Sequence, residues 1–523
     1  MIKTDVRVPI GYRVRDIEDA LLRHLPLEKH ELSNIQIIKR TLDVKDKGDI
    51  HYKMTVALSL SAEREAGLLK MRKKVSAAEA LIYEAPTSKL NSRPVVVGCG
   101  PCGLFAALAL AESGARPIVI ERGLSVDERT KKVDIFKKLS ILDTECNVQF
   151  GEGGAGTYSD GKLKSGAPDK YKMKVLREFV KAGADEEILY SQSAHLGTDK
   201  LPDIVRAIRE YIISLGGEFI FSARLVDIRV QDSRVKGAVY ISNGEEKEVE
   251  TENIVLATGH SAQDSFLLLE RIGVPMEARG FGMGVRIEHP REHINKLVYG
   301  QNPPNGLETA SYRLVTHLPN GRSVYSFCMC PGGTVVAATS TEKGIVTNGM
   351  SEYLRDGENS NAAFLVSLTP ADFPTDSPLA GITLQRQIER AAYSITESYR
   401  APSIRMSDFL ENISPKSIGA VDPTYPIGTE LVSPEKYLPS AVTDSLRAAI
   451  SDFDAWMQGF YFGDAMLTGP ETRSTSPIRV LRNENYECPT IRGLYPAGEG
   501  AGYSGGIVSS AVDGIKCAEA ILK

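Results

Sequence analysis

The sequence predicts an α/β protein organised around a parallel βαβ unit, with a large α+β domain inserted into it and a small α+β domain before it. Three observations predict this arrangement. An apolar strand, a glycine-rich turn and a helix follow one another directly within residues 95–121. A second strand, glycine loop and helix lie at residues 494–522. The chain has 523 residues, more than one ordinary hydrophobic core holds, so several domains are expected.

The first segment, residues 1–88, is predicted to be a separate small α+β domain. Residues 4–8, 35–42 and 51–60 have the pattern of strands, and residues 15–25 have the spacing of an amphipathic helix. Because these residues indicate no chemistry of their own, docking or dimerisation is the role that we expect for this segment.

A glycine-rich turn follows the first strand of the βαβ unit. Residues 95–97 form a short apolar run that suits a buried parallel strand. Gly98 permits a tight turn, Gly100 lets the backbone approach a pyrophosphate, and Gly103 lets helix and strand pack closely. The helix that follows, residues 104–113, would present its N-terminal N–H groups and a partial positive charge to the phosphates.

The acidic partner of this turn is Glu121. It ends a second apolar run, residues 117–120, and is placed to accept hydrogen bonds from a ribose. The glycine spacing itself recurs at residues 151–156 and 500–505, but neither match has the whole context of strand, helix, second strand and acid. The sequence therefore predicts a dinucleotide cofactor at the first match.

Two later turns are predicted to reach the same cofactor. Residues 253–261 read as a strand that ends at Thr258 and Gly259, and such a turn lets the backbone pass close to a flat ligand or a phosphate. A further strand runs into Gly498 and Glu499, whose carboxylate can bind a polyol hydroxyl.

A helix is then predicted to begin near Gly505 or Gly506, with its N-terminus facing a ring or a phosphate. This second contact lies hundreds of residues after the first one. It therefore favours a long cofactor such as FAD, because NAD alone would not need it.

Several motifs resemble those of known flavoproteins. Residues 95–121, the turn at residues 257–259 and the loop AGEGAG look like the FAD domain of glutathione-reductase-like flavoproteins. Four other segments resemble the FAD-dependent dehydrogenases of bacteria, so that the resemblance covers most of the chain. These segments are FGEGGAGTYSDGKL at residues 150–163, HLGTDKL at 195–201, FCMCPGG at 327–333 and ETRSTSPIR at 471–479.

The resemblance implies a bound FAD and a redox activity. With the pattern of elements, it predicts a Rossmann-like FAD-binding domain assembled from residues 89–262 and 486–523, and a substrate domain at residues 263–485. One departure is Glu499, where an aspartate is more usual, although the carboxylate is retained. The residues expected to contact FAD are Gly98, Gly100, Pro101, Cys102, Gly103, Glu121, Arg122, Gly154, Gly156, Thr157, Ser159, Asp160, Gly161, Lys162, Thr258, Gly259, Gly498, Glu499, Gly505, Gly506 and Ile507.

The cysteines leave several interpretations open. Cys99 and Cys102 spell a CGPC dithiol, but a loop that lies against a pyrophosphate favours packing over redox exchange. Cys328 and Cys330 alternate along a predicted strand, so both thiols are expected on one face. They could meet the flavin or simply pack, and two cysteines lack the remaining ligands of a zinc site.

The other catalytic candidates are polar. Lys162 is expected near the flavin ring, and Arg473 and Arg479 could orient an anionic substrate or could lie on the surface. The catalytic candidates are therefore Lys162, Arg473, Cys328 and Cys330, and no metal site is predicted.

Two absences bear on the chemistry. The loop at residues 151–163 has no cysteine, so the reaction of disulfide reductases is not expected. No second complete nucleotide fingerprint follows, so electrons would come from the substrate or from an NAD(P)H that docks transiently. The predicted function is an FAD-dependent oxidoreductase that transfers a hydride between flavin N5 and a small molecule.

Composition restricts the partners. Hydrophobic residues make up 42% of the chain, charged residues 25%, and the net charge is −5, which gives no case for nucleic acid or an anionic membrane as the main partner. No apolar run approaches the ~20 residues that span a bilayer. With seven scattered cysteines and no signal-peptide pattern, we expect a cytoplasmic protein with reduced thiols. Two alternatives stay open, a flavoprotein that acts on tRNA and a non-catalytic flavin-binding module.

Overall fold

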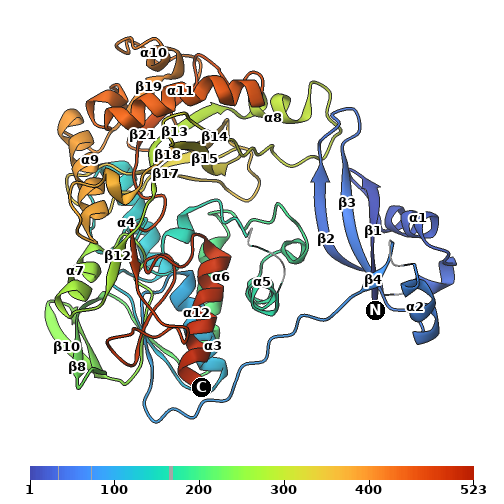
Figure 1. Ribbon diagram of the computed structural model, residues 1–523, viewed down its shortest axis with the longest axis horizontal. Coiled ribbons are helices and arrows are strands. Elements are labelled where there is room, and N and C mark those ends of the chain that lie inside the picture. The colour runs from blue at the N-terminus through green and yellow to red at the C-terminus, as the bar shows by residue number, and fades with distance from the viewer. Residues whose placement is uncertain (33, 72–73, 164–165, 167–168) are drawn as a thin grey trace.

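The computed structural model describes residues 1–32, 34–71, 74–163, 166 and 169–523. Three parts are visible in Figure 1: a small N-terminal sheet with two helices, a central sheet with the C-terminal helix beside it, and a larger sheet above (Figure 1). A long extended segment joins the first part to the second. Among the described residues no helix is both long and apolar enough to cross a membrane.

The N-terminal part is a four-stranded antiparallel sheet in the order β2-β3-β1-β4. Alternate residues of β1 point into its core, and helix α1 covers that face with Ile17, Ala20 and Leu21. The strands and the helix expected from the sequence pattern are all present. The elements are β1 (Ile2–Pro9), α1 (Val14–His24), β2 (Gln36–Asp43), β3 (His51–Leu58), α2 (Ala62–Leu69) and β4 (Ser76–Ala77).

The central sheet has five parallel strands in the order β23-β11-β5-β6-β7. Its inner strands are short and buried on both faces, which explains their unbroken apolar sequences. Residues from the beginning, middle and end of the chain therefore meet in one sheet. The strands are β5 (Val95–Val97), β6 (Ile118–Ile120), β7 (Glu218–Ile220), β11 (Ile254–Leu256) and β23 (Leu494–Pro496).

Helices cover one face of this sheet and a small antiparallel sheet covers the other. Helices α3 and α12 pack closely at Gly514. A Cβ at that position would lie only 2.1 Å from the carbonyl oxygen of Cys102. The strand expected within residues 253–261 is present as β11. The covering elements are α3 (Pro101–Glu112), α5 (Lys170–Lys181), α6 (Leu201–Ser214), α12 (Ile507–Leu522), β8 (Ala223–Gln231), β9 (Arg234–Ser242) and β10 (Glu245–Glu250).

Between β11 and β23 the chain builds a second large sheet, which we call the cap sheet. Its seven strands run in the order β14-β15-β18-β13-β21-β19-β20, and only the β19–β20 pair is parallel. The strands are β13 (Gly282–Pro290), β14 (Val315–His317), β15 (Ser323–Cys330), β18 (Asn359–Ser367), β19 (Ala401–Arg405), β20 (Thr429–Leu431) and β21 (Met466–Glu471).

Further helices and two short ribbons surround the two large sheets. Helix α11 packs across β13, β15 and β18, and its buried side chains join the apolar core of the cap sheet. The helices are α4 (Val126–Leu139), α7 (Gln263–Arg271), α8 (Arg291–Tyr299), α9 (Ala380–Thr396), α10 (Met406–Leu410) and α11 (Ser440–Trp456). The ribbons pair β12 (Met276–Ala278) with β22 (Ile478–Val480), and β16 (Thr334–Ala337) with β17 (Thr347–Met350).

Candidate active site

A cavity of about 390 Å³ lies between the carboxyl ends of the central strands and the cap sheet. Three glycine-rich turns line it, at residues 98–102, 151–156 and 498–507. This is the position where open α/β sheets bind their ligands. The early and the terminal turn therefore share one cavity, as the sequence analysis requires of a long cofactor.

Two glycines in the turn between β5 and α3 have different roles. Gly98 has a φ of +95°, and a Cβ there would lie 2.4 Å from the carbonyl oxygen of Ala257. In contrast, the nearest atom to a Cβ on Gly100 would be the Cα of Gly154, at 3.7 Å. Gly98 is thus required by the fold, whereas Gly100 leaves open space at the wall of the cavity.

Glu121, at the end of β6, is buried and lines the cavity. Its carboxylate accepts hydrogen bonds from the backbone N–H groups of Cys99 (2.8 Å), Gly123 (2.9 Å) and Gly151 (2.9 Å). A carboxylate has about four acceptor sites. Glu121 therefore ties two of the glycine turns together and keeps one acceptor site for a ligand hydroxyl.

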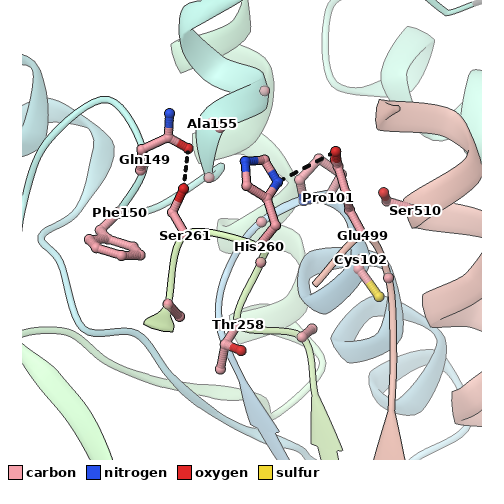
Figure 2. A pocket seen from close by; sticks show the side chains of 18 of the residues that line it. Pro101, Cys102, Gln149, Phe150, Ala155, Thr258, His260, Ser261, Glu499 and Ser510 are labelled. Atoms are coloured by element: carbon pink, nitrogen blue, oxygen red, sulfur yellow. Dashed lines mark hydrogen bonds and ion pairs between the residues drawn. The ribbon is translucent and has the colours of Figure 1, made fainter. Parts of the chain in front are cut away.

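Several polar side chains in this wall were not predicted from the sequence, among them Gln149 and His260. The amide oxygen of Gln149 accepts a hydrogen bond from the hydroxyl of Ser261 at 3.1 Å (Figure 2). The ring of His260 points toward Glu499, with Nδ1 3.5 Å from Oε1. Nε2 of His260 is buried and has no partner among the described residues. Both side chains adjoin predicted turns, so extending those motifs by one or two residues would have found them.

The terminal turn is held by an ion pair below it. The backbone N–H of Gly498 donates to Asp513 Oδ2 at 2.7 Å, and Asp513 accepts two hydrogen bonds from Arg482, at 2.6 and 3.0 Å. Gly498 has a φ of +75°, and a Cβ there would lie 2.8 Å from the Cβ of Cys102. The first and the last of the three glycine turns are therefore in direct contact. We call the side of the cavity that these turns form the cofactor wall.

Across the cavity, the cap sheet contributes side chains instead of backbone. Arg286, which is fully buried beneath this wall, donates to Asn361 at 3.0 Å and to the Cys328 carbonyl at 3.1 Å, and lies 3.4 Å from Glu471. The residues that line this side of the cavity are Phe327, Cys328, Asn348, Glu471, Arg473 and Ser474.

Glu471 is the most unusual of these groups. Burial raises the pKa of its carboxyl group to about 8, although the nearby charge of Arg286 opposes the shift. Its Oε2 atom is buried and has no hydrogen-bond partner among the described residues. Glu471 is thus a neutral carboxylic acid at pH 7 and can give up or take a proton near that pH.

The loop after the second glycine turn adds a second charged group. Asp160 is buried and accepts a 2.9 Å hydrogen bond from Arg355, and Lys162 Nζ lies 3.6 Å from it. Although burial acts in the opposite direction, Lys162 and Arg355 hold the pKa of Asp160 below its usual value. Lys162 also donates to the Met329 carbonyl, and so bridges the loop and the cap sheet.

Arg473 lines the cavity, but its charge is already paired. Its guanidinium makes two hydrogen bonds to Glu389, at 2.7 and 2.8 Å, and others to Ser340 and Thr341. Glu389 therefore already neutralises the guanidinium, and the role of Arg473 in holding an anionic substrate stays a prediction. Arg479 is not among the lining residues and lies over the ring of Tyr503.

Three predicted site residues lie behind the walls of the cavity. Gly103 packs on the turn, where a Cβ would lie 1.8 Å from the Gly98 carbonyl oxygen. The hydroxyl of Thr157 is buried 3.5 Å from the Glu152 carbonyl, and Cys330 is enclosed behind Cys328. All the other predicted contacts line the cavity. Cys99 and Cys102 are buried, and burial raises the pKa of both thiols, in agreement with packing.

The sequence relatives identify the family. An uncharacterised protein of Clostridium beijerinckii is 44% identical over 515 residues, which cover 97% of this chain and 96% of that protein. The chain belongs to the same family. In this chain the segment 280–474, which contains all seven strands of the cap sheet, matches the model described as "FAD-dependent protein, C-terminal domain-like". FAD is therefore the cofactor of the protein, and its cavity offers the glycine turns and the acidic residue that such a cofactor requires.

Solved structures show only distant likeness. The 3-ketosteroid-Δ4-(5α)-dehydrogenase of Rhodococcus jostii RHA1 is 14% identical, with 84% of this chain and 99% of that chain covered and a TM-score of 0.32. A flavocytochrome c3 fumarate reductase is 12% identical, with 92% and 83% covered and a TM-score of 0.32.

Proposed function

We propose that this protein is an FAD-dependent oxidoreductase that acts on a small molecule. One observation carries the proposal: the glycine turns and the titratable side chains of the cap sheet line the same cavity. Bound FAD would supply hydride transfer through N5 of its ring, and the protein would supply position, electrostatics and proton transfer. A site for binding alone would need no titratable groups opposite the cofactor wall.

The cofactor wall would hold FAD along its length. Gly100 leaves room for the pyrophosphate at the N-terminus of α3, where helix dipole and backbone N–H groups favour negative charge. The remaining acceptor site of Glu121 suits a ribose hydroxyl. Glu499 and His260, which also line the cavity, suit the hydroxyl groups of the ribityl chain.

The residues of the cap sheet side that line the cavity, which we call the cap wall, would contact the substrate. Glu471 is a neutral acid near pH 7, so it suits the proton that accompanies a hydride to or from a substrate carbon. Lys162 lies at the edge of the cavity and would position an electron-rich group of the substrate or of the flavin. Electrons would come from the substrate or from an NAD(P)H that docks transiently, because the sequence has no second complete nucleotide fingerprint.

The test is spectroscopic. We expect the purified protein to be yellow, to release FAD on denaturation, and to lose its flavin absorbance during anaerobic titration with NADH, NADPH or an oxidisable metabolite. A colourless protein that takes up no FAD would contradict the proposal. A yellow protein that none of these reductants bleaches, while dithionite does, would indicate a flavin-binding module instead of an oxidoreductase.

A further inference from the structure

The two cysteines of β15 are arranged differently from a regular strand. The ladder between β15 and β18 shifts register between Phe327 and Cys330, and Cys328 has a φ of +39°. A bulge of this kind re-aims side chains and breaks their alternation. As a result Cys328 reaches the wall of the cavity and Cys330 lies buried behind it. The expectation that both thiols meet the cavity from one face is therefore wrong.

The two thiols are nevertheless close together. Cys330 Sγ donates a hydrogen bond to the carbonyl oxygen of Cys328 at 3.3 Å, and the two thiols influence each other's pKa. Arg286 Nη2 lies 3.9 Å from Cys330 Sγ, and Lys162 donates to the carbonyl of Met329, the residue between the two cysteines. Two cationic groups therefore flank the pair, one beneath the wall and one at the cavity.

These surroundings divide the pair into an acidic and a weakly acidic thiol. The interaction with Cys330 lowers the pKa of the Cys328 thiol against the effect of burial, and the charges of Lys162 and Arg286 add to this. The interaction with Cys328, together with burial, raises the pKa of Cys330. A thiolate that reaches a cavity, with a thiol beside it, is the arrangement of an attacking and a resolving cysteine.

The other cysteines have no such surroundings. All of them are buried, and Cys328 alone of the seven is partly exposed. Burial raises the pKa of Cys99, Cys102, Cys146 and Cys517. Among the described residues no cluster of three or more Cys, His, Asp or Glu side chains could hold a metal ion, so the pair does not belong to such a cluster.

We propose that Cys328 and Cys330 are a redox-active dithiol that stores a second electron pair beside the FAD of this protein. This inference rests on the proposed function, because FAD is the two-electron partner of the pair. In the oxidising direction, the Cys328 thiolate and the Cys330 thiol form one S–S bond and release two electrons and one proton. The flavin ring accepts both electrons and that proton, so that charge and atoms balance. The reverse reaction restores thiolate and thiol.

The first test counts electrons. In an anaerobic dithionite titration of the air-oxidised holoprotein, we expect the wild type to take up about four electrons per FAD, two for the flavin and two for the disulfide. Cys328→Ser and Cys330→Ser should each take up about two. Cys488→Ser is the matched control and should keep the wild-type count. Cys488 is buried, and among the described residues its Sγ forms a hydrogen bond only with the hydroxyl of Thr490, at 3.4 Å.

The second test uses no variant and no flavin activity. We expect peptide mass spectrometry to find Cys328 and Cys330 joined in the oxidised protein and free after reduction, with the other cysteines free in both. In the reduced, flavin-free protein, iodoacetamide at pH 6 should modify Cys328 at least about tenfold faster than Cys488.

The outcomes separate the two proposals. A yellow wild type that takes up only two electrons, or whose pair stays reduced after oxidation, overturns the dithiol and leaves the proposed function intact. A protein that binds no FAD overturns both. A four-electron count that is lost only in the Cys328 and Cys330 variants, with the disulfide found between them, supports the dithiol.

Discussion

The two walls of the cavity differ in whether backbone turns or side chains form them. The cofactor wall consists of glycine turns, in which the Ala257 carbonyl leaves no room for a Cβ at Gly98 and the Cys102 side chain leaves none at Gly498. The cap wall consists largely of titratable and polar side chains, such as Glu471 and Cys328, near the buried Arg286. The cofactor wall therefore depends on backbone positions that accept only glycine, whereas the cap wall depends on side chains, which can change its chemistry without a change in its backbone.

The largest effect is expected where the backbone has no space. Gly98→Val should destabilise the flavin-free protein by on the order of 3 kcal/mol, because its Cβ would overlap the Ala257 carbonyl and its φ is positive. Urea denaturation of the protein without FAD measures this. Gly67→Ala is the control, since a Cβ there meets no atom within 4 Å. Equal stability of Gly98→Val and the wild type would contradict the structural role of this glycine.

The neighbouring glycine should separate folding from cofactor binding. Gly100→Val should keep nearly the wild-type stability without FAD, because the space for its Cβ is open. It should weaken FAD binding by a hundredfold or about 3 kcal/mol, since the side chain would occupy the space of the pyrophosphate. Titration of the flavin-free protein with FAD, followed by fluorescence, gives the affinity. Unchanged affinity would mean that FAD does not pass this turn.

The contribution of the cap wall to the stability of the protein should depend on pH. The pKa of Glu471 is about 8 in the folded protein against an ordinary 4.5, so its contribution to stability is full below pH 4.5 and is lost as the pH rises towards 8. Relative to Glu471→Gln, the wild type should therefore lose up to about 1.4 kcal/mol per pH unit between pH 5.5 and 7.5. Denaturation curves of both proteins at several pH values test this. Parallel pH profiles would contradict a neutral Glu471.

The same contrast explains what the sequence could and could not predict. The turn at Gly98 was predictable because its glycine spacing, the strand before it and the helix after it lie within a few residues, although the contact of Gly98 with Ala257 does not. The strands β5, β6, β11 and β23 were predictable as apolar runs beside such turns. Glu471 was not, because only the pairing of β13 with β21 brings it to Arg286, 185 residues away. The partner of Arg473 is Glu389, 84 residues away, and no local pattern connects them.

A local pattern also fails where the backbone departs from its ideal geometry. The alternation of Cys328 and Cys330 predicts one shared face, and only the β-bulge at Cys328 separates them. Thr157 likewise follows a glycine loop, but the buried Arg129 beside it draws its hydroxyl away from the cavity, at 3.5 Å.

The smallest effect is expected outside both walls, where the N-terminal sheet meets the rest of the molecule. Arg40 of β2 is buried there and pairs with Glu187 and, at 3.4 Å, with Glu308, while its guanidinium lies 4.7 Å from the Tyr52 ring centre. Glu187 is 39% exposed, so Glu187→Gln should cost less than about 1 kcal/mol of stability. FAD affinity and the electron count should not change. A loss of flavin in this variant would show that the N-terminal sheet is coupled to the cofactor wall, and the division of the site into two independent walls would then be incomplete.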